Sequence, residues 1–165
     1  MQSNLQRTEQ EFAQIYARNV KRVYQICFLY LKNKADAEDA VQTVFYKYLK
    51  AQKEFCETEH EKAWFITAAQ NTCRDLLRSF WRSHKVELEI LPEIPYEEKQ
   101  EEGVLLEKLL ELPKKYKQVL YLYYYEQYSV QEILGLLHRN QSTIRTQLSK
   151  GRERLKLNLG GYYER

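Results

Sequence analysis

The polar residues most suited to chemistry lie on one face of a predicted helix over residues 141–155. Basic, hydroxyl and amide side chains recur there at helical spacing: Arg145, Thr146, Gln147, Ser149, Lys150, Arg152 and Arg154. Such groups donate hydrogen bonds to phosphates and to base edges. The pattern is typical of a helix that contacts nucleic acid, although any helical hairpin with a basic face has a similar sequence.

Residue types that commonly carry catalysis or bind metal ions are few and scattered. The three cysteines and three histidines include no Cys-x-x-Cys pair: Cys27, Cys56, Cys73, His60, His84 and His138. This spacing argues against a disulfide framework and against a tetrahedral zinc site. Since no acid-base pair stands out either, we predict no enzyme activity, no cofactor and no metal ion.

The composition favours a helical protein. Of 165 residues, 44% are hydrophobic, while only five are Gly and three are Pro, which argues against a β-sandwich and against disorder. No run approaches the roughly 20 apolar residues of a membrane span, and the first residues do not have the pattern of a signal peptide. We therefore expect a soluble, cytoplasmic protein without direct membrane insertion.

Charge is distributed unevenly along the chain. Residues 1–84 carry 13 Lys and Arg against 10 Asp and Glu, residues 85–112 carry 3 against 9, and residues 113–165 carry 10 against 4. Two basic stretches flank an acidic one, which suggests a polyanionic partner touched at two places. Charged helix faces that serve only solubility remain an alternative.

The acidic stretch has the character of a linker. Pro92 and Pro95 interrupt it, and proline breaks both helices and central strands. We therefore predict two small domains, over 1–84 and 103–165, joined by an acidic linker over 85–102.

The first domain has the periodicity of a four-helix lobe. Apolar residues recur at three- and four-residue steps from Phe12 to Cys27, which predicts one long helix or two abutting helices. The pattern breaks at Asn33-Lys34, and two further helices follow. The predicted fold class is all-α.

Local signals place the boundaries of those two helices. Asp36 is expected to cap a helix that runs to Lys50. A loop over 52–57 separates it from the next helix, where Thr58-x-x-Glu61 predicts a capping box.

The second domain begins with apolar residues around Val104, and Pro113 suits the first position of the next helix, which ends near Tyr125. A cluster of five tyrosines lies at the end of this helix and just after it, and it either stacks on bases or forms a half-buried surface: Tyr121, Tyr123, Tyr124, Tyr125 and Tyr128.

A helix-turn-helix pattern follows. Ser129-x-x-Glu132 is a second capping box, and Asn140 can cap the basic helix described above. Two helices joined by a three- or four-residue turn form this DNA-binding motif, in which the second helix reads the major groove.

These motifs together resemble the extracytoplasmic-function (group 4) sigma factors of the sigma-70 family. Residues 36–45 (DAEDAVQTVF) resemble the signature of the region-2 helix, and residues 63–78 (AWFITAAQNTCRDLLR) resemble the helix that follows it. Leu112-Pro113 and residues 128–133 (YSVQEI) are similar to region 4. The resemblance spans nearly the whole chain, with both regions in the expected order.

The resemblance implies that the first domain binds core RNA polymerase and the −10 promoter element. The helix over 36–50 corresponds to the surface that docks on the clamp coiled coil, with these candidates: Asp36, Asp39, Gln42 and Thr43. Helix capping by the two aspartates is compatible with this role. The loop over 52–60 resembles the element that captures a flipped base. Asn71 corresponds to its pocket residue, with a solvated side chain as the alternative, and three arginines further along the helix can hold phosphates: Arg74, Arg78 and Arg82.

For the second domain, the resemblance implies recognition of the −35 element. Four residues correspond to positions that read this element: Arg145, Thr146, Ser149 and Lys150. Arg152 and Arg154 would contact phosphates, and the acidic linker would lie in the RNA exit path of the polymerase. The family further implies an anti-sigma factor, which can be linked to the membrane.

Three positions depart from the family pattern. His138 stands where the turn usually has Gly, and Arg139 where it usually has an apolar residue. A left-handed turn costs a non-glycine residue about 1 kcal/mol, and Arg139 would point either to solvent or to DNA. Thr43 replaces an acidic residue that commonly contacts the polymerase.

Other classes of function remain open on the sequence. A dimeric helix-turn-helix regulator would need a palindromic site and a dimerisation helix, and no segment stands out as that helix. A helical adaptor that binds only proteins would have no use for the basic reader face.

Overall fold

The computed structural model describes residues 2–83 and 101–159, with side chains described for 9–79 and 105–156. The chain divides into two compact units, Met1–Pro92 and Glu93–Arg165. All elements of the described residues are helices, which confirms the all-α prediction. Most of the predicted linker lies in residues 84–100, outside the described part.

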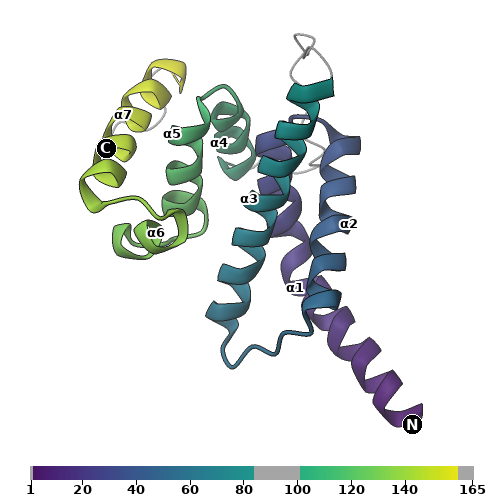
Figure 1. The fold of residues 1–165 in the computed structure, drawn as a ribbon. Helices are drawn as coiled ribbons and strands as arrows, with labels where there is room; N and C mark the ends of the chain where they lie inside the picture. Colours follow the sequence, from purple (N-terminus) through teal and green to yellow (C-terminus); the bar gives the residue numbers. More distant parts are fainter. Residues whose placement is uncertain (1, 84–100, 160–165) are drawn as a thin grey trace. The chain divides into compact units, whose positions relative to one another are not determined.

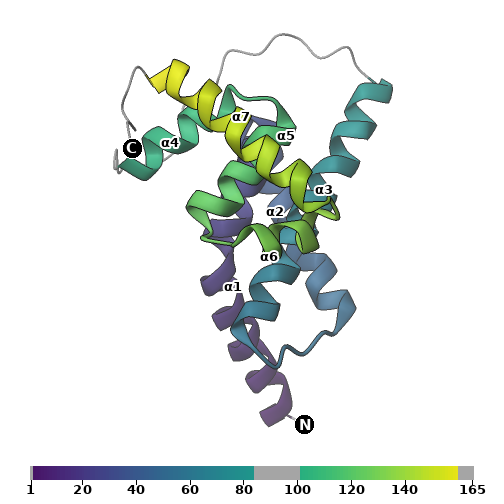
Figure 2. The same cartoon turned by 90° about the vertical axis from the view of Figure 1, so that its left-hand side faces the viewer.

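Three helices form the described part of the first unit: α1 (Gln2–Leu31), α2 (Lys34–Ala51) and α3 (Thr58–Ser83). Each packs against the other two, as both ribbon views show (Figure 1 and Figure 2). The prediction of four helices was wrong for these residues, because α1 is continuous over 30 residues. Its sequence contains neither Gly nor Pro, so nothing interrupts the backbone hydrogen bonds.

The core of the first unit is built from one apolar stripe on each helix. Fully or almost fully buried side chains come from all three: Val23, Ile26 and Cys27 of α1, Val44 and Phe45 of α2, and Phe65, Ile66, Ala69 and Cys73 of α3. The ring centroids of Phe45 and Phe65 are 5.1 Å apart, so α2 and α3 meet through aromatic packing.

Two predicted caps were wrong. Asn33, rather than Asp36, caps α2. Its side-chain oxygen accepts a hydrogen bond from the backbone N–H of Asp36 at a distance of 3.0 Å. Thr58 is the first residue of α3 rather than its N-cap. The predicted loop is confirmed, since α2 ends at Ala51 and Gln52 follows in a left-handed conformation with φ 49°.

The carboxylate of Glu61 is used for tertiary contacts instead of the predicted capping box. Oε1 and Oε2 of Glu61 accept hydrogen bonds from Nε and Nη2 of Arg18, with donor–acceptor distances of 3.0 Å. Oε1 also accepts a hydrogen bond from Nδ2 of Asn19 at a distance of 2.7 Å. Burial would raise the pKa of Glu61, but the hydrogen bonds from Arg18 and Asn19 outweigh it and hold the pKa below its ordinary value. This network ties the start of α3 to the middle of α1.

The described part of the second unit contains five helical elements: α4 (Glu101–Leu110), α5 (Lys114–Leu120), the π-helical turn η1 (Tyr121–Tyr125), α6 (Val130–Leu137) and α7 (Gln141–Leu159). Pro113 occupies the N-cap of α5 rather than the predicted first helical position. The helix does end at Tyr125 as predicted, but its last turn is π-helical. α7 packs against α4, α5 and α6 (Figure 2).

Close packing of α7 on α5 depends on Gly151. This glycine is buried in the middle of α7, and a Cβ placed on it would lie 2.9 Å from Cδ1 of Leu120. The two helices can approach this closely only because no side chain stands between them.

Candidate nucleic-acid and polymerase interface

One exposed face of α2 combines polar and apolar side chains. Asp39, Gln42 and Thr43 are exposed, whereas Asp36 is only half-buried. The Thr43 hydroxyl donates a hydrogen bond to the backbone oxygen of Asp39 at a distance of 3.0 Å. These side chains therefore lie at neighbouring positions on the outer side of the helix.

Two large apolar residues continue this face, and the sequence analysis missed both. Tyr46 is 57% exposed and Leu49 is 51% exposed. Their distances from Asp39, seven and ten residues, are the signal that could have found them, because such spacings fall on the same side of a helix. We call Asp39, Gln42, Thr43, Tyr46 and Leu49 the α2 face.

A cavity of about 450 Å³, largely open to solvent, lies beside the loop that joins α2 to α3. Its walls come from the loop and the first turns of α3: Lys53, Glu54, Phe55, Cys56, His60, Ala63, Trp64 and Thr67. The rings of Phe55 and Trp64 have centroids 6.1 Å apart. Aromatic faces of this kind can stack on a planar base.

The predicted −10 residues of α3 lie beyond this cavity. Asn71 does not line it, but follows Thr67 by four residues and so lies one turn further along the same side of α3. The side-chain oxygen of Asn71 accepts a hydrogen bond from Nη2 of Arg74 at a distance of 3.0 Å. Arg74 and Arg78 are exposed, whereas the side chain of Arg82 lies outside the described residues.

The predicted helix-turn-helix is present as α6 and α7. Ser129 and Glu132 form the reciprocal capping box. The side-chain oxygen of Asn140 accepts a hydrogen bond from the backbone N–H of Thr143 at a distance of 2.8 Å. His138 adopts the left-handed conformation with φ 55°. Both caps and the turn therefore agree with the sequence-based expectation.

Arg139 points neither of the two ways that the sequence left open. It is half-buried, and its guanidinium donates hydrogen bonds to the side-chain oxygens of Gln147 on α7 and Gln118 on α5. The sequence carried no signal for this contact, because the three residues meet only when the helices are packed.

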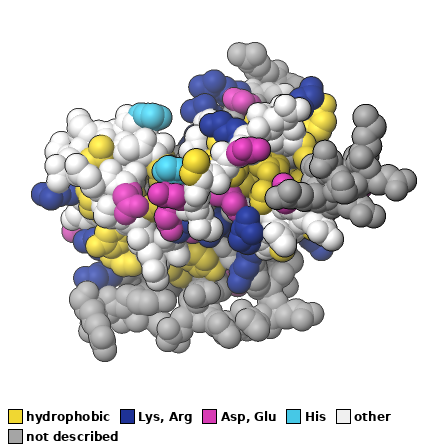
Figure 3. Space-filling view, turned by 90° about the horizontal axis from the view of Figure 1, so that it is seen from below, with side chains coloured by type: hydrophobic (Ala, Val, Ile, Leu, Met, Phe, Trp, Pro, Cys, Tyr) yellow, Lys and Arg dark blue, Asp and Glu magenta, His cyan; other side chains and the backbone are white. Residues whose placement is uncertain are grey.

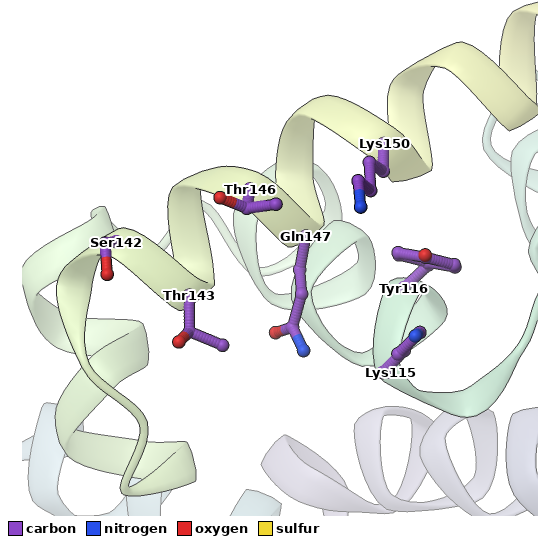
Figure 4. Close-up of a pocket in the computed structure, with 7 residues that line it drawn as sticks. All are labelled: Lys115, Tyr116, Ser142, Thr143, Thr146, Gln147 and Lys150. Carbon is purple, nitrogen blue, oxygen red and sulfur yellow. The ribbon is translucent and has the colours of Figure 1, made fainter.

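The predicted −35 residues divide between two flanks of α7. Thr146 and Lys150 line a pocket of about 280 Å³ together with five others: Lys115, Tyr116, Ser142, Thr143 and Gln147 (Figure 4). At about 100° per residue, Arg145, Ser149 and Arg152 lie on the other flank, and all three are exposed. The structure therefore does not gather the predicted readers into one cluster.

Charge does not form a field of one sign on the face that Figure 3 shows. Among the coloured residues, Lys and Arg side chains are interspersed there with Asp and Glu (Figure 3). In the described ranges, no group of three His, Cys, Asp or Glu residues could hold a metal ion. Within the same ranges, no helix is long and apolar enough to cross a membrane.

Comparison with known families assigns both units. Residues 15–83 match the family described as Sigma-70 region 2, and residues 102–155 match Sigma-70, region 4. The chain belongs to the extracytoplasmic-function sigma factors of the sigma-70 family. This sigma factor therefore serves RNA polymerase in promoter recognition and transcription initiation, which sets aside the regulator and adaptor alternatives.

Individual relatives agree with this assignment. The RNA polymerase sigma factor SigV of Bacillus subtilis (strain 168) is 28% identical over 138 residues, covering 82% of this chain and 83% of SigV. The ECF RNA polymerase sigma factor SigW of the same strain is 26% identical over 165 residues, covering 90% and 88%.

A solved structure supports the fold of this sigma factor. The sigma factor RpoE, in a co-crystal structure with the anti-sigma factor NepR from Bartonella quintana, has a TM-score of 0.74 at 18% identity. The match covers 93% of this chain and 99% of RpoE.

Proposed function

We propose that this sigma factor uses three surfaces in sequence. The α2 face binds core RNA polymerase, α7 reads the −35 element, and the cavity beside the α2–α3 loop captures a base of the −10 element with the help of Asn71. The protein acts as a non-catalytic subunit that directs the polymerase and lends it promoter specificity.

The observation that carries the polymerase contact is the exposure of Tyr46 and Leu49 beside three polar residues. Large apolar side chains that stay exposed on a polar helix often mark a protein interface. Asp36 contributes less directly, since it is half-buried in the first turn of α2.

The −10 role rests on the cavity and on the donors beyond it. Flipping a base out of the stack costs a few kcal/mol, so a pocket with aromatic walls has to compensate for it. Phe55 and Trp64 supply such walls. The exposed Arg74 and Arg78 are positioned to hold phosphates along α3, and Arg82 continues their helical spacing.

The −35 role rests on the exposed donors of α7. Arg145, Thr146, Ser149 and Lys150 are all exposed on the second helix of a helix-turn-helix, the element that enters the major groove in this motif. Arg152, on the flank away from the pocket, is assigned to a phosphate.

The domain boundaries follow from the same assignment. Region 2 would occupy residues 1–84, the acidic linker 85–102, and region 4 residues 103–165. The matched ranges, 15–83 and 102–155, support this division.

An anti-sigma factor is the remaining partner that we propose. The solved structures of RpoE and CnrH are complexes with the anti-sigma factor NepR and the cytosolic domain of CnrY, respectively. We place the protein in the cytoplasm, because bacterial RNA polymerase works there.

The polymerase contact is tested by reversing one charge. Asp39→Lys is expected to weaken binding to purified core polymerase at least about tenfold, because an interfacial charge is replaced by its opposite. Glu9→Lys removes an exposed acid from α1 and is the matched control. Equal affinity of both variants for core polymerase, with unchanged helicity, would contradict the assignment of the α2 face.

The melting role is tested at Asn71. Asn71→Ala is expected to leave binding to a duplex −35 element unchanged while reducing permanganate reactivity of the −10 thymines, because base capture follows docking. The neighbouring half-buried Gln70 provides the control variant Gln70→Ala. Normal reactivity in Asn71→Ala would return this side chain to a solvated role.

A further inference from the structure

Arg139 joins the turn of the helix-turn-helix to both α5 and α7. Its Nη1 donates a hydrogen bond to Oε1 of Gln147 at a distance of 2.9 Å, and its Nη2 donates one to Oε1 of Gln118. Gln118 is only 8% exposed. The guanidinium is therefore held between one buried amide and one amide at the edge of a pocket.

This contact determines which way the Gln147 amide faces. A guanidinium has five N–H donors and no acceptor, so only the oxygen of Gln147 can face Arg139. The NH₂ group must then point away from the arginine. Among the described residues, no hydrogen bond is made by that nitrogen.

The free NH₂ group belongs to a side chain in the middle of the proposed reader helix. Gln147 lines the pocket of about 280 Å³ between Thr143 and Lys150. Figure 4 shows Gln147 and Lys150 extending from α7 toward the side where α5 presents Lys115 and Tyr116. A ligand in this pocket would meet the amide nitrogen as a donor.

We propose that Gln147 determines specificity at one base pair of the −35 element, and that Arg139 is the positioning residue that restricts Gln147 to donating. This inference rests on the proposed role of α7. An unrestrained glutamine pairs with adenine through both its oxygen and its nitrogen. With its oxygen engaged, Gln147 instead favours an edge that offers only acceptors, such as N7 and O6 of guanine or O4 of thymine.

The test is transcription by core polymerase and the full-length sigma factor from a library of promoters with randomised −35 elements. Gln147→Ala should reduce the preference for the acceptor-bearing base about tenfold at one pair only. Arg139→Leu should raise the use of adenine at that same pair, because the oxygen of Gln147 is released. Gln147→Glu should favour a base that presents an amino group, since an acceptor replaces the donor.

Arg154→Leu is the matched control, because it removes an exposed guanidinium that lies 4.9 Å from the ring centroid of Tyr116 and leaves the hydrogen bond between Arg139 and Gln147 in place. It should lower transcription from all sequences alike. Preferences are ratios within one variant, so partial loss of folded protein does not alter them.

Three results would overturn the inference. The first is a Gln147→Ala variant that keeps every parental preference, and the second is an Arg139→Leu variant that keeps the parental preference at the Gln147 pair. The third is an Arg139→Leu variant with a relaxed preference at a different pair, which would mean that Arg139 reads DNA directly. A parental protein with no −35 preference at all would instead refute the proposed function of α7.

Discussion

Arg152 on α7 donates a hydrogen bond from Nε to the hydroxyl oxygen of Tyr124, and the two atoms are 2.6 Å apart. Its guanidinium also lies 5.6 Å and 5.7 Å from the ring centroids of Tyr123 and Tyr124. The π-helical turn that carries both tyrosines thus holds an exposed cation on the flank of α7 away from the pocket. Tyr121 and Tyr128 are buried, so these two members of the tyrosine cluster do not stack on bases.

This arrangement predicts different effects for two neighbouring cations. Arg152→Ala should weaken binding to all −35 sequences alike and reduce the salt slope by about one, because a phosphate contact carries no sequence information. Lys150→Ala should change the preference at one base pair, at a cost of about 1–3 kcal/mol. The readouts are transcription from randomised −35 elements and binding at several salt concentrations.

Tyr124→Phe serves as the control for Arg152, since it removes the hydroxyl acceptor and retains the ring. It should have a smaller effect on the salt slope than Arg152→Ala. If Lys150→Ala and Arg152→Ala both give the parental preference, Lys150 does not read bases.

Gly135 in α6 and Gly151 in α7 should respond to alanine with opposite signs. In Gly151→Ala the new methyl group would meet Leu120 at 2.9 Å, and Leu120 is only 1% exposed. Overpacking of about 1–3 kcal/mol should exceed the gain in helix propensity of about 1 kcal/mol. Gly135→Ala meets nothing within 4 Å and should stabilise by about 0.5–1 kcal/mol. Urea unfolding followed by circular dichroism measures both, and equal shifts would refute the close approach of α7 to α5.

Acid should weaken the first unit through Glu61. The pKa of Glu61 is lower in the folded protein than its ordinary value. The ionised carboxylate therefore stabilises the folded state fully at pH values above the ordinary pKa of about 4.3, and this stabilisation is lost as the pH falls through the pKa of the folded protein. Glu61→Gln should lower the free energy of unfolding by about 1–2 kcal/mol at pH 7 and flatten its decline below about pH 4.5. Glu59→Gln, which removes an exposed acid from the same turn, should do neither. An unaltered acid profile in Glu61→Gln would contradict the network with Arg18 and Asn19.

The three thiols should differ sharply in reactivity. Cys56 is exposed, whereas Cys27 and Cys73 are buried. The hydrogen bond with Cys73, together with burial, raises the pKa of Cys27 well above its ordinary value. A maleimide should therefore label one thiol rapidly in the native protein, and Cys56→Ser should abolish this phase. A bulky label on Cys56 should also reduce permanganate reactivity at −10, because Cys56 lines the cavity.

Most helix boundaries could be predicted from the sequence because local residues determine them. Ser129 and Glu132 cap α6 from positions three residues apart, and the hydrogen bond of Asn140 likewise stays within one turn. The left-handed conformation of His138 follows from the same short-range geometry. The two wrong caps of the first unit were also short-range predictions, because Asn33 rather than Asp36 caps α2 and Thr58 is the first residue of α3.

Which of the polar groups face each other depends on contacts between residues far apart in the sequence. Glu61 has the sequence pattern of a capping residue, yet its carboxylate is satisfied by α1, more than 40 residues away. Arg139 likewise meets Gln118 across 21 residues. Such contacts depend on how helices pack, which periodicity along one helix does not specify. Periodicity and local motifs were enough to place most helix boundaries and to indicate the family, whereas the packing of the helices brought the guanidinium of Arg139 to the amide of Gln147.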